Sequence, residues 1–111
     1  MVVQQWSDDT LVVRLMDDPI LSEDMAEVNL RLRAGPRDVV LDLSDVGLLT
    51  SSGLSKLLRL RKQMIESSRR LVLCSLRDKV WNVFLATGLE SIFTFTDTVA
   101  EALATIEGGR T

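Results

Sequence analysis

Residues 39–58 have the sequence VVLDLSDVGLLTSSGLSKLL, and this stretch largely decides the fold. Its first part, Val39 to Leu43, is a nearly continuous apolar run of strand length, which is typical of a central strand covered on both faces. Residues 44–50 predict a turn followed by a short apolar segment. A helix is then expected from about Ser51, because leucines recur at helical spacing on one side of it. The expected apolar side carries Leu54, Leu57, Leu58 and Ile65, widened by Leu60 and Met64.

Toward the N-terminus, two short β-rich runs precede this stretch. Val2 and Val3 belong to the first run and residues 11–15 to the second, and the polar break between them predicts a hairpin. Ser22 is the expected N-cap of a first helix, since acidic residues follow it in the first turn. Gly35 and Pro36 predict the end of that helix.

Toward the C-terminus, residues 71–74 predict another buried strand and residues 92–95 a last short one. Asp78 is the expected cap of a third helix that ends at Gly88, and Asp97 the expected cap of a fourth. The predicted order is β-β-α-β-α-β-α-β-α. It indicates an α/β fold with a mixed sheet of four to five strands and about four helices. We expect a single domain over residues 1–107 and a frayed tail over residues 108–111.

The composition excludes several classes of function. The 111 residues include no histidine and a single cysteine, Cys74, so neither a Ser-His-Asp catalytic group nor an ordinary zinc site can be assembled. An enzyme is therefore not expected, and no cofactor or metal is predicted, although the 16 acidic residues leave an all-carboxylate metal site open. A net charge of −3 gives no drive toward nucleic acid. The absence of a signal-like or membrane-spanning segment predicts a cytoplasmic protein, and the sequence leaves its oligomeric state open.

The hydroxyl cluster at Thr50, Ser51 and Ser52 falls at the expected helix start. One interpretation is simple helix capping, for which Ser and Thr are strongly preferred. The other is a phosphorylation site, because a phosphate there would meet the free N–H groups and the positive end of the helix dipole. Gly53 removes a side chain beside the hydroxyls, which would allow a partner's active site to approach closely.

The same segment resembles the signature of the STAS family, D-L-S-x-V-x-(apolar)-(apolar)-D-S-[ST]-G-L-(small)-x-L-L. Residues 42–46 match its beginning, and Ser51-Ser52-Gly53-Leu54 with Leu57-Leu58 match its end. Within the family, the chain resembles bacterial anti-sigma factor antagonists. That resemblance implies a partner that is both anti-sigma factor and serine kinase, of the histidine-kinase-like ATPase fold. It also implies that this partner phosphorylates Ser51 and then no longer binds.

The chain departs from the family pattern where Thr50 replaces the Asp before the phosphorylated residue, and Thr50 and Ser52 are alternative acceptors. The family's Gly and Asp after the second strand have no clear counterpart in residues 17–22. A second interpretation is therefore an unphosphorylated STAS subunit of a larger assembly, such as a lipid ABC transporter or a stressosome-type complex.

A basic cluster follows the signature, with Lys56, Arg59 and Lys62 near one side of the predicted helix. It is either a solvated face or a docking surface beside Ser51 for an acidic partner. With Thr50, Ser51, Ser52 and Gly53, these residues form the predicted partner-binding site. Trp81 and Phe84 are expected in the core and Cys74 as an inert buried thiol, while Trp6 is either an exposed contact or a cover on the sheet.

Overall fold

The computed structural model describes residues 2–108, and its elements follow the predicted order. Five strands and four α-helices alternate after an initial hairpin, so the predicted fold class is confirmed. In chain order the elements are β1 (Val2–Ser7), β2 (Thr10–Met16), α1 (Ile20–Ala34), β3 (Asp38–Asp45), α2 (Ser51–Glu66), β4 (Leu71–Cys74), α3 (Asp78–Thr87), the 3-10 helix η1 (Leu89–Ser91), β5 (Thr94–Thr96) and α4 (Val99–Gly108).

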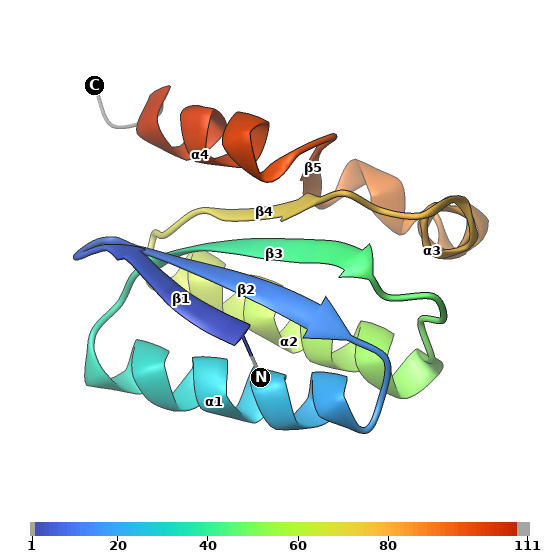
Figure 1. Ribbon diagram of the computed structural model, residues 1–111, viewed down its shortest axis with the longest axis horizontal. Helices are drawn as coiled ribbons and strands as arrows, with labels where there is room; N and C mark the ends of the chain where they lie inside the picture. Colours follow the sequence, from blue (N-terminus) through green and yellow to red (C-terminus); the bar gives the residue numbers. More distant parts are fainter. Residues whose placement is uncertain (1, 109–111) are drawn as a thin grey trace.

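The sheet has the strand order β1-β2-β3-β4-β5 (Figure 1). β1 is antiparallel to β2, and the other neighbours are parallel. β3 is the middle strand, as its apolar run predicted. The two outer strands are irregular or short, because β1 shifts register between Gln5 and Ser7 and β5 has only three residues.

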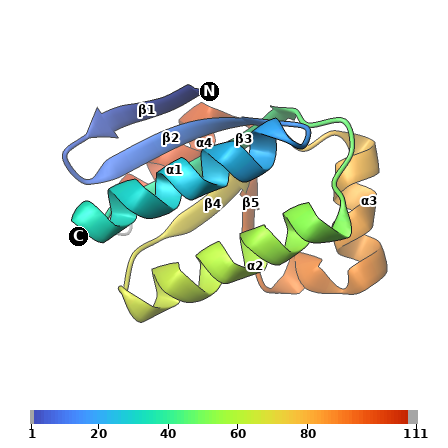
Figure 2. The ribbon, with the colours of Figure 1, turned by 90° about the horizontal axis from the view of Figure 1, so that it is seen from below.

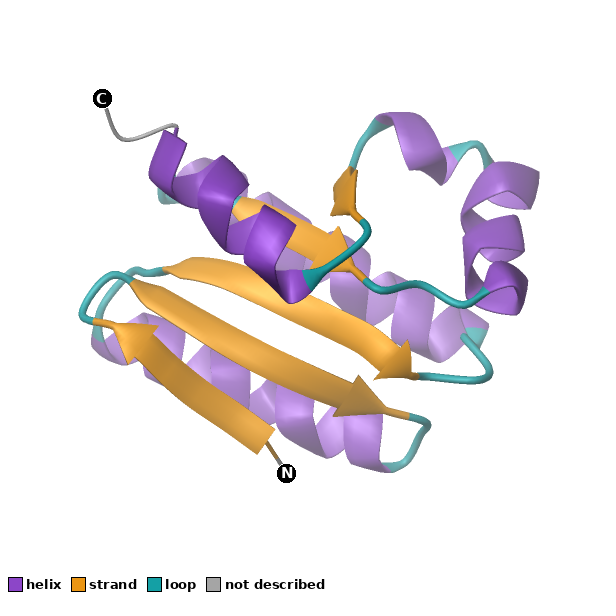
Figure 3. Ribbon diagram, turned by 45° about the horizontal axis from the view of Figure 1, so that its top comes forward, coloured by secondary structure: helices purple, strands orange, loops and turns teal. Residues whose placement is uncertain are grey.

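The helices form a layer on each face of the sheet. α1 and α2 run side by side beneath one face (Figures 1 and 2), and α4 lies on the other, above β4 and the neighbouring strands. Alternate strand residues pack on α1 and α2, among them Leu11, Leu41 and Leu73. The intervening Val40 and Val72 pack against α4. No helix covers the outer face of β1 and β2 in the described part of the chain (Figure 3).

The first helix begins earlier than predicted. Ser22 is not its N-cap, because α1 already begins at Ile20. The side chain of Asp18 takes the capping role: its Oδ1 accepts hydrogen bonds from the Ser22 backbone N–H at 3.0 Å and from the Ser22 hydroxyl at 2.6 Å. Asp and Ser have similar preferences for helix starts, so residue type alone does not distinguish Asp18 from Ser22.

Two other predicted caps are wrong by one residue. α3 has Arg77 at the N-cap and Asp78 as its first helical residue. At the start of α4, the hydroxyl of Thr98 accepts from the Glu101 N–H at 3.1 Å, so Thr98 and not Asp97 caps the helix. Acidic residues are favoured both at the cap and in the first turn, which explains the error at Asp78. Asp97 and Thr98 are adjacent residues of types that both cap helices, so residue type alone did not separate them.

The predicted helix ends are confirmed at Gly35 and Gly88, and Gly88 has a left-handed φ of 73° that suits glycine. Ile65 was wrongly placed on the apolar side of α2, since 58% of it is exposed. The last strand begins at Thr94, two residues after the predicted start. Gly108, assigned to the tail, is the last residue of α4, and residues 109–111 lie outside the described residues.

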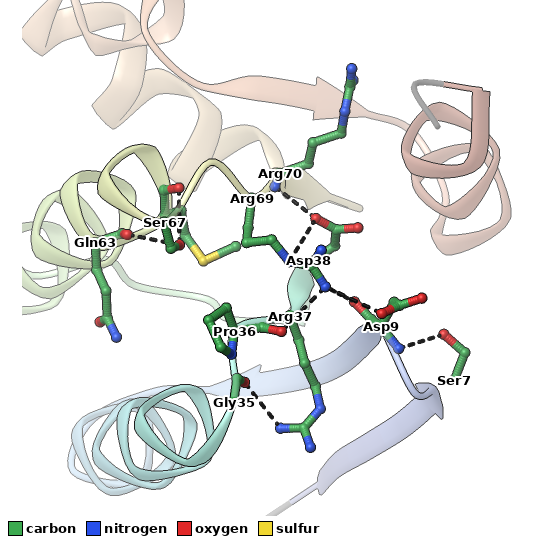
Figure 4. A network of polar contacts seen from close by, with 11 residues as sticks. Ser7, Asp9, Gly35, Pro36, Arg37, Asp38, Gln63, Ser67, Arg69 and Arg70 are labelled. Carbon is green, nitrogen blue, oxygen red and sulfur yellow. Dashed lines mark hydrogen bonds and ion pairs between the residues drawn. The ribbon is translucent and has the colours of Figure 1, made fainter. Parts of the chain in front are cut away.

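A polar network ties three loops together at the amino end of the parallel strands (Figure 4). The Arg69 guanidinium donates to the carbonyls of Pro36 at 3.2 Å and Asp9 at 3.3 Å. It also lies 3.7 Å from Asp38 Oδ1, which accepts the Arg70 backbone N–H at 2.8 Å. The β1–β2 turn, the loop before β3 and the loop before β4 are therefore joined by one side chain.

Candidate functional site

Thr50 is the N-cap of α2, as the capping interpretation predicted. Its hydroxyl oxygen accepts a hydrogen bond from the Gly53 N–H at 3.0 Å. The same hydroxyl donates to Asp18 Oδ2, at the start of α1, at 3.2 Å. Thr50 thus joins the beginnings of the two helices, and both of its hydrogen-bonding roles are in use.

Ser51 and Ser52 are exposed in the first turn of α2. The Ser52 oxygen accepts a hydrogen bond from Lys56 Nζ at 2.8 Å, one turn further along the helix. Among residues 2–108, the Ser51 side chain has no hydrogen-bond partner. It projects from the end of a helix whose first N–H groups lack intrahelical acceptors and whose dipole is positive there.

Gly53 has a different role from the predicted one. It is buried, and a Cβ at this position would lie 3.1 Å from Leu49 Cδ1 and 3.7 Å from Leu21 Cδ2. The glycine therefore lets the start of α2 pack closely on the core and on α1, and its Cα does not face solvent.

Asp17 and Asp18 complete the site, although neither was predicted to belong to it. Asp17 Oδ1 accepts the backbone N–H groups of Gly47 at 2.8 Å and Leu48 at 3.1 Å, which holds the β3–α2 loop against the β2–α1 loop. The hydrogen bond from Ser22 is the main reason that the pKa of Asp18 is held below its ordinary value of 3.8. The only signal in the sequence was an acidic pair before a proline, which is equally typical of a plain turn.

Exposed apolar side chains surround these carboxylates. Leu48 is 65% exposed in the β3–α2 loop, and Met16 and Ile20 flank the β2–α1 loop with exposed side chains. Asp17 bonds to the Leu48 N–H, so the two loops lie together at the carboxyl end of the sheet (Figure 1). Exposed apolar side chains beside polar groups are typical of a protein-binding surface.

The three residues of the basic cluster share one side of α2. Lys56 and Arg59 line a groove between α1 and α2, and Arg59 continues with Lys62 along the exposed side of the helix. Arg61 points the other way, and its Nε donates to the Ile92 carbonyl at 2.9 Å. The structure thus places Lys56, Arg59 and Lys62 on one side, as the sequence predicted, and Lys56 beside the hydroxyl cluster.

The remaining residues of interest lie away from this site. Phe84 is fully buried and Trp81 partly buried, with Phe95 in edge-to-face contact with both rings at 5.1 and 5.0 Å. Burial raises the pKa of the Cys74 thiol to about 11, which keeps it protonated. Trp6 is 52% exposed. Within residues 2–108, no group of three or more Asp, Glu or Cys residues is arranged to hold a metal ion, and no helix is long and apolar enough to cross a membrane.

Comparison with known proteins agrees with this fold. The family model of the STAS domain matches residues 3–102. BtrV of Bordetella bronchiseptica, whose name includes the words anti-sigma factor antagonist, is 40% identical over 68 residues, which span 61% of this chain and 59% of that protein. The match thus covers less than two thirds of that relative.

Two solved structures share the fold across nearly the whole chain. One comes from Thermotoga maritima and also carries the name anti-sigma factor antagonist; it has a TM-score of 0.83 at 24% identity and covers 93% of this chain and 92% of its own. The other is the anti-sigma factor antagonist SpoIIAA of Bacillus. In its unphosphorylated form it has a TM-score of 0.83 at 19% identity, with 96% of each chain covered.

Proposed function

Because this chain belongs to the STAS domain family, we propose that it is a regulatory switch that binds an anti-sigma factor and is controlled by phosphorylation of Ser51. The similarity to BtrV and to the structures of anti-sigma factor antagonists supports this function. The partner is then an anti-sigma factor that is also a serine kinase, of the histidine-kinase-like ATPase fold. The chain itself acts by binding and carries out no catalysis.

The observation that carries the proposal is the difference between the three hydroxyls. Thr50 both accepts from Gly53 and donates to Asp18, and Ser52 accepts from Lys56. Ser51 is exposed and its side chain is unbonded among the described residues, so a kinase can reach it without breaking a contact of the fold. Ser51 is therefore the proposed acceptor, ahead of Thr50 and Ser52.

A phosphate on Ser51 would act on binding more than on folding. It adds about −1.5 to −2 charges at the N-terminus of α2, where the dipole and free N–H groups favour an anion. Its charge would also lie on the residue next to Thr50, whose hydroxyl donates to the carboxylate of Asp18. A partner that binds this surface in its neutral form would then have to desolvate a dianion.

The test is to incubate the chain with its cognate kinase and ATP and to locate the phosphate by mass spectrometry. We expect phosphate on Ser51 in the wild type and none in Ser51→Ala. Ser51→Asp should weaken binding to the partner at least about tenfold, or about 1.4 kcal/mol, and change the melting temperature by only a few degrees. Ser91→Asp, which places the same charge at an exposed serine of η1, is the matched control and should bind normally.

Phosphate on Thr50 alone would move the acceptor by one residue. No phosphate on the cluster, together with unchanged binding by Ser51→Asp, would refute the switch. An unphosphorylated STAS subunit of a larger assembly would then be the better description of this chain.

A further inference from the structure

A groove of about 210 Å³ lies between α1 and α2, which run side by side beneath the sheet (Figure 2). Its floor is apolar, because Met25 of α1 faces Leu60 of α2, and Ala26 lies at its exposed edge. The groove is smaller than the ~300–1,000 Å³ of ordinary small-molecule pockets, so it suits a few side chains better than a whole ligand. A shallow apolar trough between two helices is the surface that an amphipathic helix of another protein occupies in helix-in-groove recognition.

The rim of this α1–α2 groove is positive, although the chain as a whole has a net charge of −3. Lys56 and Arg59 line it, and no acidic side chain does so in the described residues. Glu27, which is also on α1, is instead paired with Arg31. Arg31 Nε lies 3.3 Å from Glu27 Oε1. A partner that fits the groove must therefore carry carboxylates beside its apolar side chains.

The groove also reaches the proposed switch. Ser22 lines it and donates its hydroxyl to Asp18, and Lys56 lines it and donates to Ser52. A segment seated in the groove would thus contact Lys56, which lies about one helical turn from Ser52, the neighbour of Ser51. A phosphate on Ser51 would compete for Lys56 with the carboxylates of that segment.

We propose that the α1–α2 groove binds an acidic amphipathic helix of the partner protein, with apolar side chains on Met25, Ala26 and Leu60 and carboxylates on Lys56 and Arg59. This inference rests on the proposed function and identifies the surface and the chemistry of its partner. Nucleic acid is the weaker fit, because the rim has two cations on an acidic protein and the floor is aliphatic.

The test uses a defined helical peptide of about 15 residues, built from glutamate and alanine with two leucines one turn apart. Titrated into the isotope-labelled full chain, it should shift the backbone amide signals of Ala26, Asn29, Leu60 and Gln63 most strongly. Replacing both leucines by serine should weaken binding at least about tenfold, because the apolar contact is lost. Raising the salt concentration from 50 mM to 500 mM should weaken it several-fold.

Two tryptophan variants provide the matched comparison. Ala26→Trp blocks the groove at an exposed position of α1, whereas Ala104→Trp adds the same side chain to an exposed position of α4 on the other face. We expect at least about tenfold weaker peptide binding for the first and less than twofold change for the second. If Ala26→Trp proves to be misfolded, Arg59→Glu, a charge reversal at an exposed position, decides the same question.

Amide shifts centred elsewhere on the chain, equal binding of the serine peptide, or unchanged binding by the groove variants would overturn the proposal. A free chain that is a dimer in sedimentation, and that Ala26→Trp converts to a monomer, would also overturn it, because the groove would then bind a second copy. The phosphorylation assay is separate from this one. Phosphate on Ser51 without peptide binding refutes only the groove, and groove binding without phosphate refutes only the switch.

Discussion

Replacing Thr50 by alanine tests the junction between the two helix starts. The variant loses the cap hydrogen bond to the Gly53 N–H at 3.0 Å and the hydrogen bond to Asp18 at 3.2 Å. Loss of an N-cap costs about 1 kcal/mol, and the bond to a partly exposed carboxylate adds roughly 0.5 kcal/mol, because water can replace the lost donor. We expect a loss of about 1–2 kcal/mol in the free energy of unfolding. For a domain of this size, this lowers the melting temperature by roughly 5–10 °C.

Urea unfolding and a thermal scan measure this change, and Thr50→Ser is the control. Serine keeps the hydroxyl and both hydrogen bonds, so we expect a loss below about 0.5 kcal/mol. Equal stability of the alanine variant and the wild type, or equal losses in both variants, would show that the hydroxyl does not join the helices.

Thr50→Asp extends the series by introducing the residue that the STAS signature has here. Aspartate caps a helix well, but it has no proton at neutral pH to donate to Asp18, and the two carboxylates would repel each other. Mutual repulsion raises the higher of the two carboxyl pKa values. The loss of stability is therefore present above that pKa and disappears as the pH falls through it, because one carboxyl group then becomes neutral. We expect Thr50→Asp to be less stable than Thr50→Ser at pH 7 and to approach it below about pH 4. A constant difference across this range would contradict the explanation.

Two further substitutions test features outside the site. Asp24 is 1% exposed, and its carboxylate has no hydrogen bond among the described residues. Burial raises the pKa of Asp24 above 3.8. The contribution of Asp24 to the free energy of unfolding therefore falls as the pH rises above 3.8, because the buried carboxyl group then loses its proton. Asp24→Leu should be about 1–3 kcal/mol more stable than the wild type at pH 7 and should lose this pH dependence. If urea unfolding at pH 7 finds the variant less stable than the wild type, the buried carboxylate does not destabilise the fold. Arg69→Met should lose about 1–3 kcal/mol in the same measurement, because the contacts to Asp9, Pro36 and Asp38 are removed. Arg70→Met is the control for Arg69→Met. Arg70 contacts Asp38 through its backbone N–H, and the Arg70 side chain points away from the network (Figure 4). Equal losses of stability in the two variants would contradict the role of the Arg69 side chain.

Much of the fold could be predicted because local chemistry and burial agree. The run at residues 39–43 is apolar except for Asp42, and it forms the middle strand with helices on both sides. Gly35 and Gly88 end their helices as expected. Ile65 shows the limit of helical periodicity, since it recurs at helical spacing yet is exposed near the end of α2. Periodicity gives the spacing of a face but not how far the core extends along the helix.

The candidate site was predicted only in part. The hydroxyls are adjacent in the sequence, so their place at the start of α2 followed from residue type alone. The role of Asp18 depends on a contact with Thr50, which is 32 positions away in the chain. Propensity describes each segment separately and cannot show that two helix starts share a carboxylate. The same limit explains why Gly53 was assigned to the surface, although Leu21 of α1 is packed against it.

The outer strands have a consequence for how this chain avoids aggregation and for how it is recognised. A regular exposed strand offers a row of unpaired N–H and C=O groups, onto which another chain can add its own strand. Here the shift of register in β1 between Gln5 and Ser7 interrupts one edge, and β5 leaves only three residues on the other. Both edges are therefore poor templates for adding a strand from another chain, whether a partner's or that of a misfolded copy. The helices and loops are therefore better placed than the sheet edges to contact another protein.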